Sequence, residues 1–112
     1  MNPTEPKMVL MVPKAGHDLI AAERLRQITQ EGFDYDHDMN HRAATLSTAG
    51  KCYIDHADFQ LRNPGVKMAA DPPAGWPWGP RWWKPSEDPV RNLVKGGALI
   101  AAAIDRARAD PS

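Results

Sequence analysis

Apolar positions recur with helical spacing in three separate segments of the chain. In the first segment, Asp18 is a good N-cap and Gly32 is suited to follow the last helical turn. The apolar positions between them are Ala21, Leu25 and Ile28, at i, i+4 and i+7. Residues with this spacing share one face of a helix. The pattern predicts a first helix over residues 18–31 that buries its apolar face.

The second segment carries a longer apolar stripe with the same period. It follows a run of Asp and Asn residues, any of which can cap a helix. Its apolar positions are Ala43, Leu46, Gly50, Tyr53 and Ala57. They predict a second helix over residues 39–59, with this stripe as its inner face.

The third segment has the clearest start and stop signals. Asp88 is suited to the N-cap, Pro89 to the first helical position, and Pro111 to a place beyond the last turn. The apolar stripe consists of Leu93, Gly97, Ile100, Ile104 and Ala107. The small residues Gly96, Gly97 and Ala98 let another helix approach closely, at a helix-propensity cost of about 1 kcal/mol for each glycine.

Proline and glycine dominate residues 61–88, so no regular element is expected to persist there. All four tryptophans of the chain lie in this stretch: Trp76, Trp78, Trp82 and Trp83. Such aromatic density argues against disorder, and we expect at least residues 75–85 to pack on the helices.

These patterns predict an all-α fold of three main helices with a long Pro/Trp-rich flap. The apolar run Met8–Val12 adds a candidate for a short N-terminal strand. Residues 1–16 are expected to form a flexible N-terminal arm, and residues 17–110 a single helical domain.

The composition narrows the class of protein. The 112 residues include 14 basic and 14 acidic groups, so no basic stripe points to nucleic acid as a partner. Cys52 is the single cysteine, which excludes an internal disulfide. The N-terminal apolar run is too short for a signal segment or a membrane span. We therefore expect a soluble, cytoplasmic protein without a membrane partner.

A polar stripe runs along the first predicted helix. Glu23, Gln27 and Glu31 lie at i, i+4 and i+8, away from Leu25 and Ile28. One interpretation is a solvated face with local ion pairs. A functional interpretation requires that the stripe, together with Arg24, have a partner inside the molecule.

Two histidines form the second candidate cluster, in the motif His37-Asp38-x-x-His41. On a helix, imidazoles at i and i+4 share a face and can bind one metal ion. Alternatively, Asp38 caps a helix and the histidines pack or stay in solvent. The dipeptides His17-Asp18 and His37-Asp38 also resemble those of HD-type metal phosphohydrolases.

The aromatic loop and the start of the third helix form the third cluster. Trp76, Trp78 and Trp83 lie close in sequence to Arg81 and Lys84. A nucleobase can stack on indole while lysine and arginine hold its phosphates. Arg91 and Lys95, at i and i+4, would add positive charge near a helix N-terminus. Equally, the tryptophans can cover a small core.

Several short motifs occur in a fixed order over residues 22–106. They are Glu23-Arg-x-Arg-Gln27, Glu31-Gly32, His37-Asp-x-x-His41, Trp76-Pro-Trp78, Trp83-Lys-Pro85, Arg91-x-Leu-Val-Lys95, Gly97-Ala-Leu-Ile100 and Ile104-Asp-Arg106. In this combination the chain resembles a family of small proteins encoded by tailed phages and prophages. The resemblance implies an accessory protein of the bacterial cytoplasm and supplies no catalytic residue. The turn Gly75-Trp-x-x-Gly79, with Lys84-Pro85 after it, is similar to the RyR-type domain.

Three functions are consistent with these features. The first is a homo-oligomer that binds a nucleotide-derived small molecule without turnover or cofactor, and so sequesters a host defence signal. The second is a metal-dependent nucleotide (pyro)phosphohydrolase with a divalent metal at the histidines. The third is an inhibitor of a host enzyme that uses the tryptophans as a hot spot. The expected ligand-binding residues are Glu23, Arg24, Gln27, His37, Asp38, His41, Trp76, Trp78, Trp83, Lys84, Arg91 and Lys95.

Overall fold

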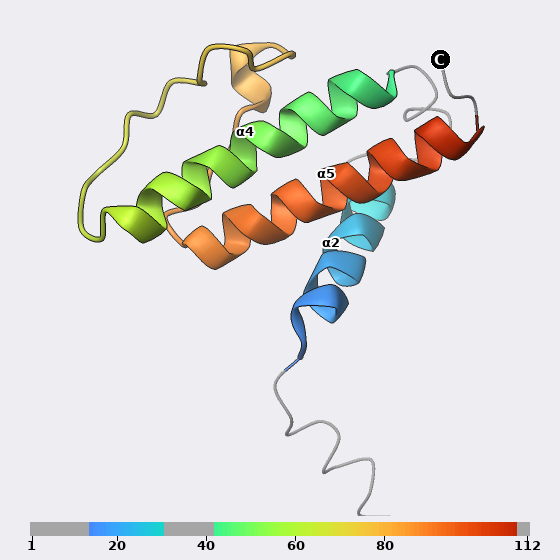
Figure 1. The fold of residues 1–112 in the computed structure, drawn as a ribbon, viewed down its shortest axis with the longest axis horizontal. Coiled ribbons are helices and arrows are strands. Elements are labelled where there is room, and N and C mark those ends of the chain that lie inside the picture. Colours follow the sequence, from blue (N-terminus) through green and yellow to red (C-terminus); the bar gives the residue numbers. More distant parts are fainter. Residues whose placement is uncertain (1–13, 31–41, 110–112) are drawn as a thin grey trace, which may run out of the picture.

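Among the residues that the structure describes, the regular structure consists of three α-helices and one short 3₁₀ turn. The structure, a computed structural model, describes residues 14–30 and 42–109. The helices are α2 (Gly16–Gln30), α4 (Ala43–Arg62) and α5 (Pro89–Ala109), with the 3₁₀ turn η1 at Pro80–Trp82 (Figure 1). No strand occurs in the described ranges, and the all-α prediction is confirmed. The candidate strand Met8–Val12 lies outside them.

α4 and α5 pack side by side in antiparallel directions (Figure 1). Their backbones touch where two glycines face each other. A Cβ atom added to Gly50 would lie 2.9 Å from the Gly96 carbonyl oxygen, and one added to Gly96 would lie 2.9 Å from that of Gly50. The predicted close approach at the small residues is therefore confirmed, and it occurs within the chain.

The hydrophobic core lies between this helix pair and the loop that joins α4 to α5. Its buried members are Leu46, Ala49, Cys52, Tyr53, Trp83, Leu99, Ala102 and Ala103. The predicted inner face of the second helix is confirmed at Leu46, Gly50, Tyr53 and Ala57, which are all buried. The loop itself is irregular apart from η1, in agreement with the proline content.

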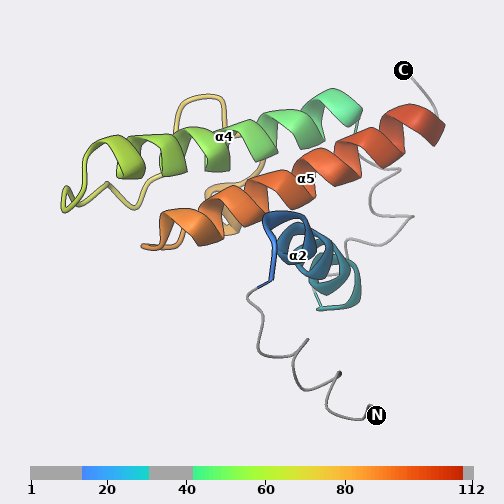
Figure 2. The ribbon, with the colours of Figure 1, turned by 60° about the horizontal axis from the view of Figure 1, so that its bottom comes forward.

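α2 crosses α5 at a steep angle (Figure 2). The crossing point is Gly97, because a Cβ atom added there would meet the Ile20 side chain at 2.7 Å. The packing of α2 is the reverse of our prediction: Leu25 is 61% exposed, whereas Glu23 and Gln27 are 2% and 3% exposed. The polar stripe is the face that finds partners, because Arg91 of α5 pairs with Glu23.

The predicted inner stripe of α5 is also partly wrong. Leu93 is 38% exposed and Ile104 is 53% exposed, while Ala98, Leu99 and Ala102 are buried. The close approach of α4 at Gly96 is made by small residues, and the buried face of α5 is turned away from the predicted Leu93 and Ile104. Ile100 still packs against Gly50, where an added Cβ atom would lie 3.1 Å from its Cδ1 atom.

Some of the predicted helix ends are confirmed and others are wrong. Asp88 caps α5 as predicted, because its Oδ1 atom accepts a hydrogen bond from the Val90 N–H at 2.9 Å. Asp18 is not the N-cap of α2 but a first-turn residue whose carboxylate accepts from the Ala15 N–H at 3.3 Å. α4 begins at Ala43 instead of residue 39, because Arg42 has an extended backbone. It continues to Arg62, where Asn63 caps its end.

No helix within residues 14–30 and 42–109 has the length and apolarity that crossing a bilayer requires.

Candidate functional site

A buried carboxylate lies between α2 and α5. Glu23 accepts two hydrogen bonds from Arg26, one turn along the same helix: Nε to Oε1 at 2.8 Å and Nη2 to Oε2 at 2.7 Å. From α5, the Arg91 Nη2 atom lies 2.6 Å from Oε1. The Gln27 amide adds a longer hydrogen bond of 3.3 Å to Oε2. We call these four residues, Glu23, Arg26, Gln27 and Arg91, the polar seam.

The polar seam keeps Glu23 ionised although its side chain is only 1% exposed. Burial is the largest single influence and raises the pKa of this carboxyl. The hydrogen bonds and positive charges of Arg26 and Arg91 together outweigh it, so the net pKa is lowered. A buried anion therefore fixes the position of two guanidinium groups that come from different helices.

The functional interpretation of the α2 stripe required an inward partner, and Arg91 is that partner. The alternative of a fully solvated face is wrong for Glu23 and Gln27. Gln27 also has a buried carbonyl oxygen, Oε1, that accepts no hydrogen bond in the described structure. An unsatisfied buried acceptor is costly, and sites that bind ligands are where such groups are commonly retained. Arg24, also predicted at the site, lies 3.6 Å from Asp105 on α5.

Lys95 of α5 contacts both the loop and α4. It follows Arg91 by one turn on α5, and its Nζ atom donates a hydrogen bond of 2.6 Å to the Lys84 carbonyl oxygen. The Lys84 N–H in turn donates to the Tyr53 hydroxyl at 3.0 Å. The Lys95 ammonium also lies 5.7 Å from the centre of the Tyr53 ring. These contacts join α4, α5 and the loop at the base of the Lys84 side chain.

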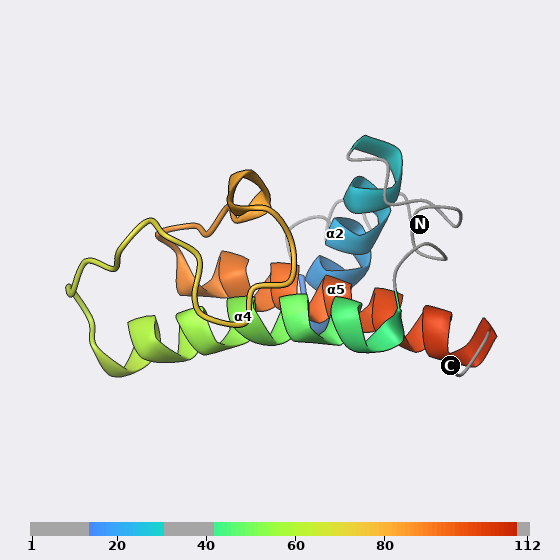
Figure 3. The same cartoon turned by 90° about the horizontal axis from the view of Figure 1, so that it is seen from above.

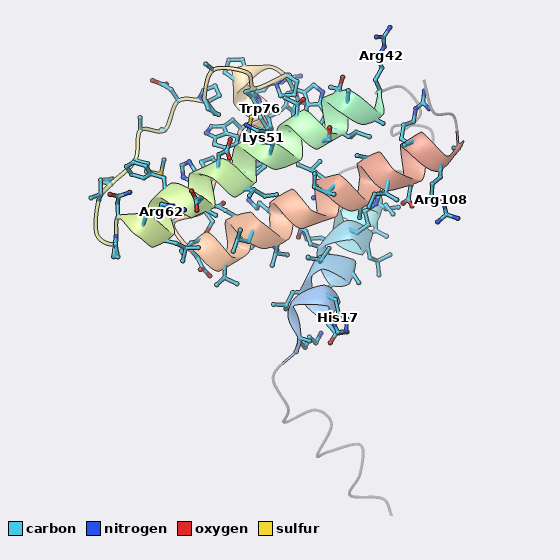
Figure 4. All side chains as sticks on the ribbon, viewed as in Figure 1. His17, Arg42, Lys51, Arg62, Trp76 and Arg108 are labelled. Atoms are coloured by element: carbon cyan, nitrogen blue, oxygen red, sulfur yellow. The ribbon has the colours of Figure 1, made fainter. Side chains whose placement is uncertain are left out.

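The tryptophan loop, residues 75–85, is built around one buried indole. Trp83 is 6% exposed, and its ring centre lies 4.6 Å from that of Tyr53 and 4.9 Å from that of Trp76. Trp78 meets Trp76 edge to face at 5.4 Å. Trp76 lies over α4 (Figure 4) and donates its indole hydrogen bond to the Gly79 carbonyl oxygen at 3.2 Å. Trp76, Trp78 and Trp83 thus cover the core, as one of our two interpretations expected.

Trp82 is the tryptophan that faces solvent, with 47% of its surface exposed. The Arg81 guanidinium carbon lies 4.9 Å from its ring centre, and the Lys84 ammonium nitrogen lies 5.8 Å from it. Trp82 is not among the ligand-binding residues expected from the sequence. The signal that could have found it is its position between Arg81 and Trp83, because neighbouring residues in an extended or turn segment cannot all point into the core.

A polar network fixes the far end of the loop. Asn92, fully buried at the start of α5, accepts a hydrogen bond from the Ser86 N–H at 2.8 Å. Its amide nitrogen donates to the Ser86 main-chain carbonyl and to the Gln60 side-chain oxygen Oε1, both at 2.8 Å. The loop is therefore anchored to both α4 and α5 before it enters α5.

The tryptophan loop and the C-terminal half of α2 lie on the same side of the α4–α5 pair (Figure 3). Of the predicted site residues, the structure joins Glu23, Gln27 and Arg91 by direct contact. It joins Lys84, Lys95 and Trp83 through Tyr53.

The predicted metal site cannot be placed from these contacts. His37, Asp38 and His41 lie outside the described residues, as does Glu31. Within the described ranges, no group of three or more His, Cys, Asp and Glu side chains is arranged to hold a metal ion. His17 and Asp18, the first of the His-Asp pairs, lie 3.5 Å apart at the exposed start of α2.

Comparison of the chain with models of protein families, with curated proteins and with solved structures finds no match in any of the three.

Proposed function

We propose that this protein binds a nucleotide-derived small anion without turning it over, in the cytoplasm of a bacterium that carries a phage or prophage. The observation that carries the proposal is the inward polar stripe of α2. Glu23 is buried against Arg91 from α5, while Leu25 is left in solvent. A helix that reverses its expected packing in this way sacrifices apolar burial, and such departures from the folding pattern are concentrated at functional sites.

Charge and aromatic groups beside the seam suit the proposed ligand. Arg91 uses one nitrogen for Glu23, and a guanidinium has further N–H groups that can contact a phosphate. Lys84 is linked to α5 by the hydrogen bond from Lys95, and it has no carboxylate within 4 Å among the residues that the structure describes. Its main chain is fixed by Tyr53 and Lys95, so its position is set before a ligand binds.

The direct test is isothermal titration calorimetry, in which nucleotides are titrated into the purified full chain. The panel consists of ATP, GTP, a cyclic dinucleotide and adenosine without phosphate. We expect stoichiometric binding of at least one phosphorylated compound and none of adenosine. Native mass spectrometry of gently purified protein should show the bound ligand and count the protomers, which tests the expected homo-oligomer. Absence of binding for every phosphorylated compound at about 1 mM would refute the proposal.

Variants then test the site. Lys84→Ala and Arg91→Lys should each weaken binding, because one removes a charge and the other removes the two-pronged geometry of guanidinium. Arg91→Lys is preferable to Arg91→Ala because it leaves Glu23 with a cationic partner. Lys67→Ala is the matched control: Lys67 is an exposed loop lysine that makes no ion pair among the described residues, and its loss should leave the affinity unchanged.

Turnover separates this function from the hydrolase alternative. The same protein is incubated with each bound nucleotide and added Mn²⁺, and phosphate or pyrophosphate release is measured. Binding of the nucleotide without release of phosphate or pyrophosphate supports the proposed function. Multiple turnovers per protein molecule would show instead that the protein is a hydrolase.

A further inference from the structure

We propose that Trp82 is the stacking platform for the base of the bound nucleotide, with Arg81 and Lys84 holding its phosphate groups. This inference rests on the proposed function and names the part of the surface that recognises the ligand. The evidence is that the Trp82 indole is exposed and has two cationic groups near its ring. The other tryptophans of the loop pack against the core.

The loop fixes the backbone of Trp82 without covering its ring. The Trp82 N–H donates to the Gly79 carbonyl oxygen at 3.0 Å, and the Trp83 N–H donates to that of Pro80 at 3.1 Å. Pro80 begins the turn, and the buried Trp83 anchors its end. A ligand that stacks on Trp82 therefore meets an indole whose backbone is already ordered, and less conformational entropy is lost on binding.

Packing does not account for the position of Trp82. The ring contacts that join Trp76, Trp78, Trp83 and Tyr53 do not extend to it. Nearly half of its surface is open even with Arg81 and Lys84 beside it. An exposed indole on an ordered turn offers a flat aromatic face on which a planar ligand can stack.

The two cations are available for an anion. Neither Arg81 nor Lys84 has a carboxylate within 4 Å in the described structure, and both cationic groups lie near the Trp82 ring. Base stacking on an aromatic ring is tolerant of base identity, whereas phosphate contacts supply charge recognition. The combination therefore selects planar anions over neutral nucleosides and over phosphate alone.

Two probes separate the base from the phosphates: ATP, and inorganic tripolyphosphate, which carries the charge but has no base. Three single variants are compared with the wild-type chain: Trp82→Leu, Trp82→Phe and Arg81→Ala. Lys67→Ala serves again as the charge-matched control. Equal thermal unfolding of each variant and the wild type confirms that the fold is kept, as expected for exposed side chains.

We expect Trp82→Leu to weaken ATP binding by roughly 5- to 150-fold, the range for loss of one base–aromatic stack. The same variant should leave tripolyphosphate binding unchanged, and Trp82→Phe should retain most of the ATP affinity. Arg81→Ala should weaken the binding of both probes. ATP should also quench indole fluorescence in the wild type and not in Trp82→Phe.

Unchanged ATP affinity in Trp82→Leu would overturn the inference and leave the proposed function intact, since the wild-type chain would still bind. Equal weakening of ATP and tripolyphosphate in that variant would also overturn it, because the indole would then act without the base. Where the wild-type chain binds another nucleotide of the panel and not ATP, that nucleotide replaces ATP as the probe; failure to bind any of them would instead count against the proposed function itself.

Discussion

From the geometry of the polar seam we predict how much Arg91→Ala lowers the free energy of unfolding. The Glu23 side chain is 1% exposed, and this change removes the partner at 2.6 Å while Arg26 remains. Removing one partner of a fully buried ion pair costs about 3–5 kcal/mol, and exposed pairs are worth about 0–1 kcal/mol. Because Arg91 is 37% exposed and Arg26 still neutralises the carboxylate, we expect a loss of about 2 kcal/mol between these limits.

Urea denaturation at pH 7, followed by circular dichroism, measures this loss. The control is Arg62→Ala, which removes an arginine that pairs with Asp58 at 3.0 Å but is 75% exposed. This control should change the free energy of unfolding little. The double variant Glu23→Gln/Arg91→Ala should lose less than the sum of its single changes, because no buried charge is left without its partner.

The pH dependence of stability checks the sign of the same interaction. The folded-state pKa of Glu23 is lowered, so its contribution is fully present above the usual pKa of 4.5 and is lost as the pH falls through the lowered value. Glu23→Gln should flatten this acid-side loss. Equal unfolding midpoints for Arg91→Ala and Arg62→Ala, or an unchanged acid profile in Glu23→Gln, would refute the assignment of a stabilising buried carboxylate.

Three further predictions concern packing. Gly96→Ala should destabilise the fold by about 1–3 kcal/mol, because the added Cβ atom would meet the Gly50 backbone. The Cβ atom added in Gly97→Ala would meet the Ile20 side chain, which can move, so this variant should lose less stability. Thermal unfolding compares the two variants. Asn92→Ala should lower the free energy of unfolding by about 1–3 kcal/mol, because it leaves the buried partners of the Asn92 amide without a hydrogen bond. Hydrogen exchange of the backbone amides in residues 75–88 should become faster. Burial raises the pKa of the Cys52 thiol, so thiol reagents at pH 8 should modify the native protein slowly and the urea-unfolded chain rapidly; fast native labelling would contradict the assigned burial.

The sequence patterns predicted those parts of the fold that depend on local signals. The capping of α5 at Asp88 and the inner face of α4 follow from residues within a few turns of each other. The close approach of α4 and α5 at Gly96 could also be predicted, because the run of small residues there is apparent from the sequence.

The packing of α2 could not be predicted in the same way. An amphipathic pattern assumes that the apolar face is the buried one. Glu23 is buried because Arg91, far along the chain, reaches it from α5. A single sequence does not show such a pairing. Once α2 used its polar face, Leu25 remained in solvent, where it is 61% exposed.

The candidate site was expected from residue types, and the binding role of these residues stays a prediction. Of the expected residues, the structure joins Glu23, Gln27 and Arg91 by direct contact. Which indole would be exposed depended on the turn at Pro80–Trp82 and on the contact between Trp83 and Tyr53, and both are tertiary features.

The two helix contacts of this protein differ in the force that maintains them. α4 and α5 exclude water around an apolar core, whereas α2 is joined to α5 mainly through ionised groups and the contact of Ile20 with Gly97. We expect α2 to open as a separate sub-global event with weaker denaturant dependence than global unfolding, because release of one helix exposes less surface than unfolding of the whole chain. In native-state hydrogen exchange, the amides of α2 would then form an early unit, and those around Leu46 and Leu99 would exchange only through global unfolding.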